Sequence, residues 1–422
     1  MPLLNQFTQI FKIKDLRKKI FFVLLLFVVF RIMSVIPMPG VDATYLAQFF
    51  NKFQALGFAN VLSGGALSTL SIAMLGLGPY ITAIIIFELL TLIFPSLQKM
   101  YKEEGEAGRK KFNQYARLAT VPLAAMEAYG MLTLFKSQGA ISIDSGLTLL
   151  TSIITVTAGS VFLMWLGELI TEKGIGNGVS LLIFAGIVAR FPLSIKQAYD
   201  MRIPGQLPAY LFFIAAVIVI IFGVVLITEA RRNIPVSYAK RVRGTKMYGG
   251  VSTYLPMNVN PAGVIPIIFA MSILMIPGMV TNFIGKGSGI AQNISNFFSA
   301  GWSHGIMYFA LVFVFTFFYT MVTFDPKSIS ENLQKMGGFV PGIRPGPSTA
   351  KYIAFILHRV LFIGALFLAL IAVLPSIIEG LTNITSFSFL LGGTSVLIIV
   401  SVVLDTIKQI NSQLQMREYE KI

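Results

Sequence analysis

Long apolar runs recur along the whole chain, and each is continuous rather than alternating between apolar and polar positions. A helix needs about 20 apolar residues to cross the hydrocarbon core of a bilayer, whereas the strands of a membrane barrel alternate with a period of two. The pattern therefore predicts an all-α polytopic membrane protein. Ten runs are candidate spans, at about 19–37, 76–95, 114–135, 148–171, 178–196, 209–229, 262–284, 304–324, 353–374 and 388–409.

One apolar stretch, residues 57–79, breaks this pattern because Gly and Ser interrupt it too often for a continuous span. Non-helical backbone at membrane depth is tolerated only where protein or a water-filled cavity surrounds it. The run Ser63-Gly64-Gly65-Ala66 permits close helix packing, and it equally permits a short segment that moves inside a bundle. Both interpretations stay open here. The stretch favours a channel or a transporter over an inert anchor.

Composition agrees with a membrane protein, since 55% of the 422 residues are hydrophobic and only 12% are charged. The first apolar run continues through Arg31 without a small-residue cleavage site, so we expect it to be retained rather than removed as a signal peptide. The chain has no Cys and two His residues, which excludes disulfides, Cys metal sites and His-rich metal sites. We therefore predict no bound metal.

The net charge of +15 is distributed unevenly over the predicted loops. If the N-terminus is cytoplasmic, the ten spans place 26 of the 33 Lys and Arg residues on the cytoplasmic side and seven on the other side. The positive-inside rule then predicts that both termini lie in the cytoplasm. Every membrane protein needs such an asymmetry, so most of these charges require no further function.

Two predicted cytoplasmic loops, about 230–261 and 325–352, are longer and more basic than topology requires. Loops of this length in a compact protein are usually functional or disordered. The dense Pro and Gly residues of 341–347 preset backbone angles, which predicts an ordered protrusion that displays Arg344. Such a surface suits a polyanion, for example ribosomal RNA, or an acidic protein face.

Few ionisable residues fall inside the predicted spans, and burial in a bilayer makes each of them a functional candidate. Glu88 and Glu127 lie well within their segments, where they either handle ions or hydrogen-bond to neighbouring helices or to a wet path. The run Gly285-Lys286-Gly287 does not fit a P-loop, because Val280 stands where the first Gly is needed and Gly287 where Ser or Thr is needed. Residues 174–178 are better interpreted as a tight turn between two spans than as a dinucleotide fingerprint. We predict neither an enzyme nor a cofactor.

Seven motifs occur in the order of a known family. They are FRIMSVIPMPG (30–40), LSGGALSTLSI (62–72), KEEGEAGRKK (102–111), FLMWLGELITEKGIGNGVS (162–180), NPAGVIPIIFA (260–270), GGFVPGIRPG (337–346) and GGTSVLIIV (392–400). Together they cover nearly the whole chain, which resembles SecY, the channel subunit of the Sec protein translocon.

The resemblance implies ten transmembrane helices in two inverted, pseudosymmetric five-helix halves around a central pore. The N-terminal half would be residues 1–196, with spans 1–5, and the C-terminal half residues 197–422, with spans 6–10. It also implies a plug at about residues 57–69 that fills the outer funnel of the idle channel. The plug positions are Gly57, Ser63, Gly64, Gly65, Ala66 and Thr69.

A constriction of aliphatic side chains is implied as well. Its family positions fall on Leu77, Ile81, Val179, Ile183, Ile268 and Ile398, and all six are aliphatic in this sequence. A narrow, dry ring gates by dewetting, and it can close around an extended peptide without binding a particular sequence. Spans 2 and 3 would part from spans 7 and 8 as a lateral gate, with Thr82 and Glu127 as candidates for the polar contact that tunes opening.

The function implied is a protein-conducting channel that passes unfolded polypeptides and releases apolar segments laterally into lipid. The sequence contains no motor motif, so the resemblance implies an external driver, the SecA ATPase or the ribosome. The driver would dock on Arg231, Arg232, Lys240, Arg241 and Arg344. Further implied partners are the small subunits SecE and SecG, signal peptides and nascent polypeptides, all in a bacterial inner membrane.

A secondary transporter is the alternative, because it too uses inverted repeats, broken helices and a site near the bilayer midplane. A transporter would need polar coordinating groups where the resemblance implies six aliphatic residues. A structural scaffold would have no pore at all.

Overall fold

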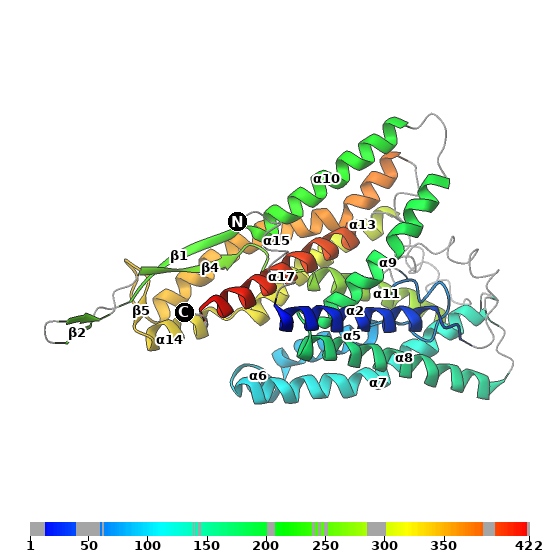
Figure 1. The fold of residues 1–422 in the computed structure, drawn as a ribbon, viewed down its shortest axis with the longest axis horizontal. Coiled ribbons are helices and arrows are strands. Elements are labelled where there is room, and N and C mark those ends of the chain that lie inside the picture. Colours follow the sequence, from blue (N-terminus) through cyan, green and yellow to red (C-terminus); the bar gives the residue numbers. More distant parts are fainter. Residues whose placement is uncertain are drawn as a thin grey trace. The chain divides into compact units, whose positions relative to one another are not determined.

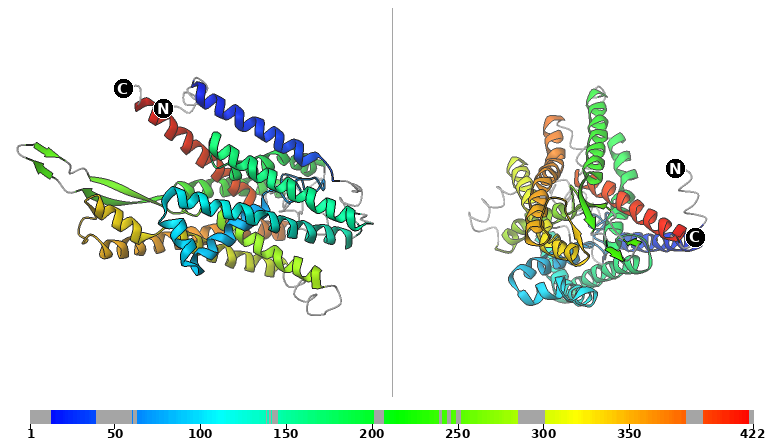
Figure 2. Two further views of the ribbon diagram at one scale, coloured as in Figure 1. Left: turned by 90° about the horizontal axis from the view of Figure 1, so that it is seen from below. Right: turned by 90° about the vertical axis from the view of Figure 1, so that its left-hand side faces the viewer.

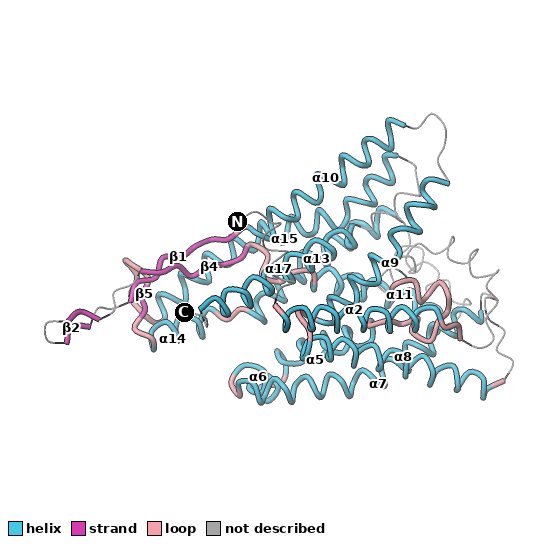
Figure 3. Tube along the Cα trace, in the orientation of Figure 1, coloured by secondary structure: helices cyan, strands magenta, loops and turns pink. Residues whose placement is uncertain are grey.

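A computed structural model of the protein describes residues 13–38, 60, 63–137, 139, 141, 145–200, 207–238, 241–243, 246–248, 252–284, 301–382 and 393–419. Figure 1 shows the chain as a ribbon, Figure 2 adds two further views, and Figure 3 marks helices and strands. The described residues are mostly helical, as the apolar runs predict.

The helices are α2 (Lys14–Val35), α5 (Gly78–Ile93), α6 (Pro95–Lys102), α7 (Gly105–Ser137), α8 (Gly146–Lys173), α9 (Gly178–Asp200), α10 (Leu207–Glu229), α11 (Ile265–Ile284), α13 (Gly301–Thr323), α14 (Pro326–Lys335), α15 (Pro347–Thr382) and α17 (Gly393–Tyr419). The strands are β1 (Arg231–Tyr238), β2 (Arg241–Arg243), β3 (Lys246–Tyr248), β4 (Ser252–Asn258) and β5 (Gly338–Phe339). The predicted tight turn at residues 174–178 is confirmed, since α8 ends at Lys173 and α9 begins at Gly178.

Several described helices are long and apolar enough to cross a membrane. Five qualify singly, and a sixth span results if the bent pair of α5 and α6 is counted as one. The five are Gly105–Lys136, Gly146–Lys173, Trp302–Lys335, Pro347–Leu374 and Ser395–Met416. Shorter apolar helices cover Gly178–Leu193, Ile214–Glu229 and Ile265–Leu274. These helices support a polytopic membrane protein, while the total of ten spans stays a prediction.

Local sequence explains several helix ends. Ser145 caps the first turn of α8 by accepting a hydrogen bond from the Leu147 N–H, and Asp325 caps α14 in the same way. A Pro in the first turn begins α5. Pro95 disfavours helical backbone at Phe94, and the chain bends there by 112° between α5 and α6.

The chain divides into two compact units. The first unit contains Met1–Gln206, Ser272–Phe298 and Ile384–Ile422, and the second contains Leu207–Met271 and Ser299–Asn383. In the first unit α5 packs against α7, α7 against α8 and α8 against α9, while α2 contacts both α8 and α9 and α17 contacts α9. The predicted inverted halves, residues 1–196 and 197–422, stay a prediction.

Glycines allow very close packing between α8 and its neighbours in the first unit. A Cβ added at Gly159 would overlap the Ile72 carbonyl oxygen, and a Cβ at Gly178 would overlap the Gly167 carbonyl oxygen. The Gly178 N–H also donates to the Thr171 hydroxyl at 2.9 Å. Gly178 therefore holds the start of α9 directly against the last turns of α8.

Replacing Gly178 with alanine is expected to destabilise the protein by about 1–3 kcal/mol, because the added methyl group overpacks a contact made by backbone atoms. The measurement is the midpoint of thermal unfolding of the purified protein in detergent. Gly146→Ala is the matched control, since Gly146 also begins a helix and nothing lies within 4 Å of an added Cβ there. Equal midpoints for the two variants would contradict the close contact.

The second unit combines three long helices with a small sheet. α13 and α10 both pack against α15, and α14 packs against both α15 and β5. The sheet has the strand order β4-β1-β5, in which β1 is antiparallel to both neighbours. β2 and β3 form a separate antiparallel hairpin within the same loop as β1 and β4. In Figure 3 the three sheet strands lie together beside α14.

This sheet joins the two basic loops that the sequence presents separately. Ser237 and Tyr238 of the first loop pair with Phe339 and Gly338 of the second. Burial in β1 alternates in the way expected for a strand with one covered face. The core beneath it consists of Ile234, Val236, Met257, Leu333, Val340, Ile353 and Leu357. The two loops are therefore parts of one folded element.

Candidate functional site

The broken apolar stretch forms consecutive turns over residues 63–77, not a helix, and it is fastened to the C-terminal end of α2. The Met38 N–H donates to the Leu70 carbonyl at 2.9 Å, and the Ile72 N–H donates to the Ile36 carbonyl at 3.1 Å. These bonds flank an isolated antiparallel bridge. Backbone hydrogen bonds at Leu70 and Ile72 thus hold the middle of the stretch against the chain that follows α2.

The apolar side chains of the same stretch are buried in the first unit. Leu67 and Leu70 are at most 1% exposed and share a core with Leu132 and Phe135 of α7. The remaining members of that core are Met38, Met74, Ala128, Met131, Ile141 and Val156. A segment too broken to span a membrane is therefore covered by protein, as its composition requires.

The glycines of the predicted plug serve close packing in this conformation. A Cβ on Gly64 would lie 2.9 Å from both the Gly186 Cα and the Phe30 ring. Gly64 and Gly65 have φ values of +66° and +93°, which side chains other than glycine rarely adopt. The alternative role of these glycines as hinges stays a prediction. Gly57 lies outside the described residues.

The turns lead directly into the first predicted ring residue. Leu77 caps α5 and Ile81 follows one turn later, while Val179 and Ile183 hold the same relation in the first turns of α9. The Ser160 hydroxyl of α8 donates to the Gly76 carbonyl at 2.8 Å and fixes the backbone just before Leu77.

The other two ring positions come from later helices. Ile398 is buried on α17, which packs against α9 within the first unit. Ile268 is buried on α11, in the part of that helix that belongs to the second unit. Five of the six predicted ring residues therefore share one unit, with Leu77 and Ile183 buried and Ile81 and Val179 partly exposed.

The structure brings together the two residues predicted for the lateral gate. Thr82 of α5 and Glu127 of α7 are hydrogen-bonded through their side chains. The Thr82 hydroxyl also lies 3.0 Å from the Gly78 carbonyl oxygen, one turn earlier in α5. The pair therefore links two neighbouring helices of the first unit.

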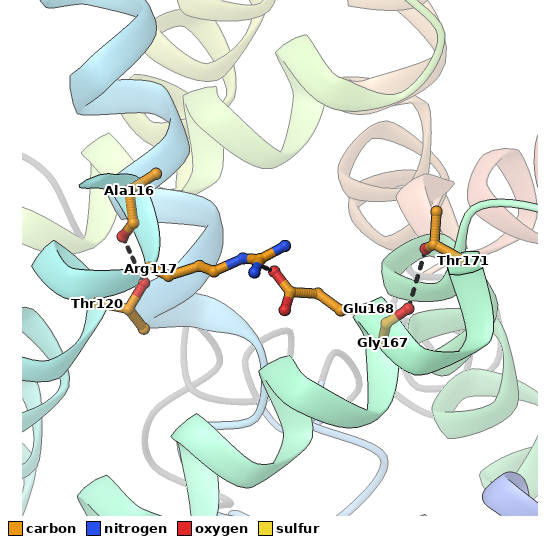
Figure 4. Close-up of polar contacts among 6 residues, drawn as sticks. All are labelled: Ala116, Arg117, Thr120, Gly167, Glu168 and Thr171. Carbon is orange, nitrogen blue, oxygen red and sulfur yellow. Dashed lines mark hydrogen bonds and ion pairs between the residues drawn. The ribbon is translucent and has the colours of Figure 1, made fainter. Parts of the chain in front are cut away.

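A second polar cluster escaped the sequence analysis. Arg117 of α7 forms an ion pair with Glu168 of α8, and Figure 4 shows the two side chains reaching toward each other between their helices. Tyr80 of α5 hydrogen-bonds to the same carboxylate. In the sequence, Arg117 and Glu168 each appear only as a single charged residue near the end of a predicted span. Only helix packing shows that they neutralise each other.

Basic residues proposed for partner docking lie on the folded element of the second unit. Arg231 and Arg232 are exposed on β1, and Arg344 is exposed in the loop after β5. Arg241 lies on β2. Lys240 is outside the described residues.

Hydrogen bonds to the backbone carbonyls of Arg344 and Gly346 hold the Arg344 loop in place. The Ser330 hydroxyl of α14 donates to the Gly346 carbonyl at 2.7 Å, and the Thr349 hydroxyl donates to the Arg344 carbonyl at 2.9 Å. Gly342 and Gly346 have positive φ, as the predicted Pro- and Gly-rich turns require. The ordered protrusion expected from the sequence is confirmed.

Comparison with known proteins decides the family. A sequence model described as SecY matches residues 71–407, which is most of the chain. The chain belongs to the SecY family. The protein translocase subunit SecY of Corynebacterium glutamicum is 44% identical over 98% of this chain and 98% of its own length. The Thermotoga maritima subunit is 43% identical, with coverage of 98% and 96%.

Solved structures share the fold at 20% identity, each covering 93% of this chain and 91% of its own. One is the structure of a protein-conducting channel, with a TM-score of 0.65. A second, with a TM-score of 0.64, concerns how the plug domain of the SecY protein stabilises the closed state of the translocation channel and maintains a membrane seal. A third comes from a canine ribosome–channel complex, with a TM-score of 0.62.

Family and fold together establish what kind of molecule this SecY-family chain is. It is an integral membrane protein and the channel subunit of a protein translocase. Such a subunit conducts polypeptides and is not an enzyme.

Proposed function

We propose that unfolded polypeptides pass through a ring formed by Leu77, Ile81, Val179, Ile183, Ile268 and Ile398, and that residues 57–69 plug the idle channel. One observation carries this proposal. The buried, turn-rich segment of residues 63–76 runs directly into Leu77, so the segment and the first ring residue are held in one continuous piece of backbone. Such an arrangement suits a plug adjoining a constriction.

The proposal includes a lateral gate in which the hydrogen-bonded pair Thr82 and Glu127 tunes opening. Leu or Phe gains about 0.3–0.6 kcal/mol at the centre of a membrane helix, whereas a charged residue costs about 2.5–3.5 kcal/mol. An apolar segment therefore supplies its own free energy for moving sideways into lipid. Polar segments continue through the ring.

We further propose ten spans in two inverted halves, with both termini in the cytoplasm of a cell with a bacterial inner membrane. The exposed Arg231, Arg232 and Arg344, with Lys240 and Arg241 in support, would receive the driving partner, SecA or the ribosome. The likeness to a chain from a ribosome–channel complex supports the second of these partners. SecE and SecG would complete the complex.

The test is whether one translocating polypeptide touches Ile81 and Ile268 at the same time. Both residues are replaced by cysteine in this otherwise cysteine-free chain, and a polypeptide with two neighbouring cysteines is stalled during transport and oxidised. The proposed pore predicts a product in which one polypeptide is joined to both positions, because a chain held in a narrow passage touches every residue of its ring.

Ile154→Cys on α8 is the matched control, because Ile154 is 58% exposed on an apolar helix and lies outside the proposed ring. We expect no crosslink there. A transporter or a scaffold would give no crosslink at any of the three positions. Crosslinks to Ile81 or Ile268 that never occur together would contradict the ring.

A further inference from the structure

Two arginines from different helices reach the glycine run of the plug segment. The Arg31 guanidinium of α2 donates to the Gly64 carbonyl at 2.8 Å. The side chain of Arg190 on α9 lies against the next residue, with its Cδ and Nε each 3.3 Å from the position that a Cβ on Gly65 would occupy. The charges of the two arginines are close enough to interact with each other.

Both arginines lie within apolar helices and are half-buried, so each needs a compensating contact. A hydrogen bond from a charged donor to a backbone carbonyl is roughly twice as strong as one between neutral groups. The backbone of the plug segment supplies that acceptor for Arg31 at Gly64. If the segment left its present position, Arg31 would lose this acceptor while the neighbouring charge of Arg190 remained.

The rest of the segment is attached in a different way. The Thr69 hydroxyl donates to the Ser34 carbonyl at 3.0 Å. The backbone of Leu70 and Ile72 is hydrogen-bonded to Met38 and Ile36, at the end of α2 and just after it. Leu70 is the one described residue other than glycine with a positive φ, at +41°. Strained backbone of this kind often marks a switch point. Leu70 therefore belongs to the second attachment, and the two attachments meet between Gly65 and Thr69.

We propose that Arg31 and Arg190 form a latch on the plug. Arg31 holds the Gly64 carbonyl, Arg190 covers Gly65, and residues 69–72 act as a fixed anchor on α2. Opening breaks the arginine contacts and swings the portion before Thr69 about the anchor. The idea rests on the proposed role of residues 57–69 as a plug, and it adds the residues that keep the plug seated.

The test measures how fast a thiol reagent labels a cysteine placed at Ser63. Ser63 is 2% exposed, is nearly isosteric with cysteine, and would be the only cysteine of the chain. The full chain is used in its translocase complex in lipid nanodiscs, so that reagent reaches both faces. Arg31→Gln should raise the labelling rate about tenfold, since it removes one charge-assisted hydrogen bond.

Two comparisons separate the latch from general effects of charge or packing. Lys136→Gln removes an exposed cation in the last turn of α7 and should leave the labelling rate unchanged. Arg31→Lys keeps a charged donor and should remain within about threefold of the parent, because a cation can still reach the carbonyl. An unchanged rate in Arg31→Gln, or an equal rise in the lysine variant or the control, would overturn the latch.

Arg190→Gln provides a second variant that leaves the Gly64 bond in place, and it should give a smaller rise in labelling. If the Arg31→Gln protein does not assemble into the translocase complex, the labelling rate of Arg190→Gln tests the latch instead. A stalled polypeptide should also accelerate labelling in the parent, because it displaces the plug. Acceleration by Arg31→Gln without acceleration by the polypeptide would support the latch and contradict the plug role, whereas the reverse result would overturn the latch alone.

Discussion

Arg344→Glu is expected to abolish partner-driven transport while the channel still folds and assembles. Arg344 is exposed, and the backbone carbonyls of Gly346 and of Arg344 itself accept hydrogen bonds from Ser330 and Thr349. The side chain is therefore displayed on a fixed support. Reversing one charge at an acidic or polyanionic interface costs about 2–5 kcal/mol, which corresponds to a loss of at least thirtyfold in partner affinity.

The measurement is the initial rate of ATPase-dependent import of a precursor protein into vesicles that contain the translocase. Lys173→Glu is the control, because it makes the same change of charge at an exposed residue that lies outside the two basic loops. We expect the control to transport within about threefold of the parent, since isolated surface charges contribute little. Normal transport by Arg344→Glu would remove this residue from the docking surface.

Ser330→Ala separates the charge of Arg344 from its placement. The substitution removes the buried hydrogen bond to the Gly346 carbonyl and leaves Arg344 in the chain. A bond of this kind contributes about 0.5–1.5 kcal/mol, so transport should fall by less than about tenfold. An intermediate rate would show that the fixed position of the loop contributes to docking.

The sequence predicted the two basic loops and an ordered conformation for residues 341–347. It did not predict that strands of the two loops pair in one sheet. Pro and Gly act locally, so their turns can be anticipated from a short window. The pairing of Tyr238 with Gly338 joins segments far apart in the chain and has no local signature. The available signal was the spacing of Ile234 and Val236, two apolar residues two positions apart, because such alternation marks a strand with one covered face.

Helices were also predictable from local sequence, since the length of a continuous apolar run indicates the length of the membrane helix. Contacts between helices were not. Arg117 and Glu168 belong to different predicted spans, and nothing near either residue indicates the other. Thr82 and Glu127 were named through a family resemblance, and their hydrogen bond depends on how α5 packs against α7. Polar partners inside a bundle require the packing to be known.

Hydropathy alone could not identify the proposed ring residues. An isoleucine that lines a pore, packs in a core or faces lipid has the same apolar signature. Ile183 and Ile398 are almost fully buried in the structure, whereas Ile81 and Val179 are partly exposed, so burial does not identify them as a set either. Their assignment comes from the resemblance, and a functional measurement has to test it.

Replacing ring residues with serine is expected to increase ion conductance through the idle channel. An aliphatic ring excludes ions by staying dry, and hydroxyl groups favour water in the same space. An aliphatic side chain disfavours contact with water by about 1.5–3 kcal/mol, and a small polar side chain lacks this free energy. Each exchange should therefore raise the probability that the ring fills with water by about tenfold or more. Leu77→Ser and Ile183→Ser are the variants, measured as single-channel current without a substrate.

Ile154→Ser on α8 controls for introducing a hydroxyl into an apolar helix, because Ile154 lies outside the proposed ring and is largely exposed. Its conductance should equal that of the parent. Unchanged current in both ring variants would count against the ring.

In the proposed arrangement the plug and the ring are two barriers in series, so opening one leaves the resistance of the other. Ile183→Ser alone should therefore raise the current only severalfold, and Arg31→Gln alone should do the same by unseating the plug. Combining the two substitutions should increase the current by more than the sum of the separate increases, because neither barrier then limits flow. A strictly additive result would show that ions bypass one of the two barriers, and it would contradict the placement of plug and ring on a single path.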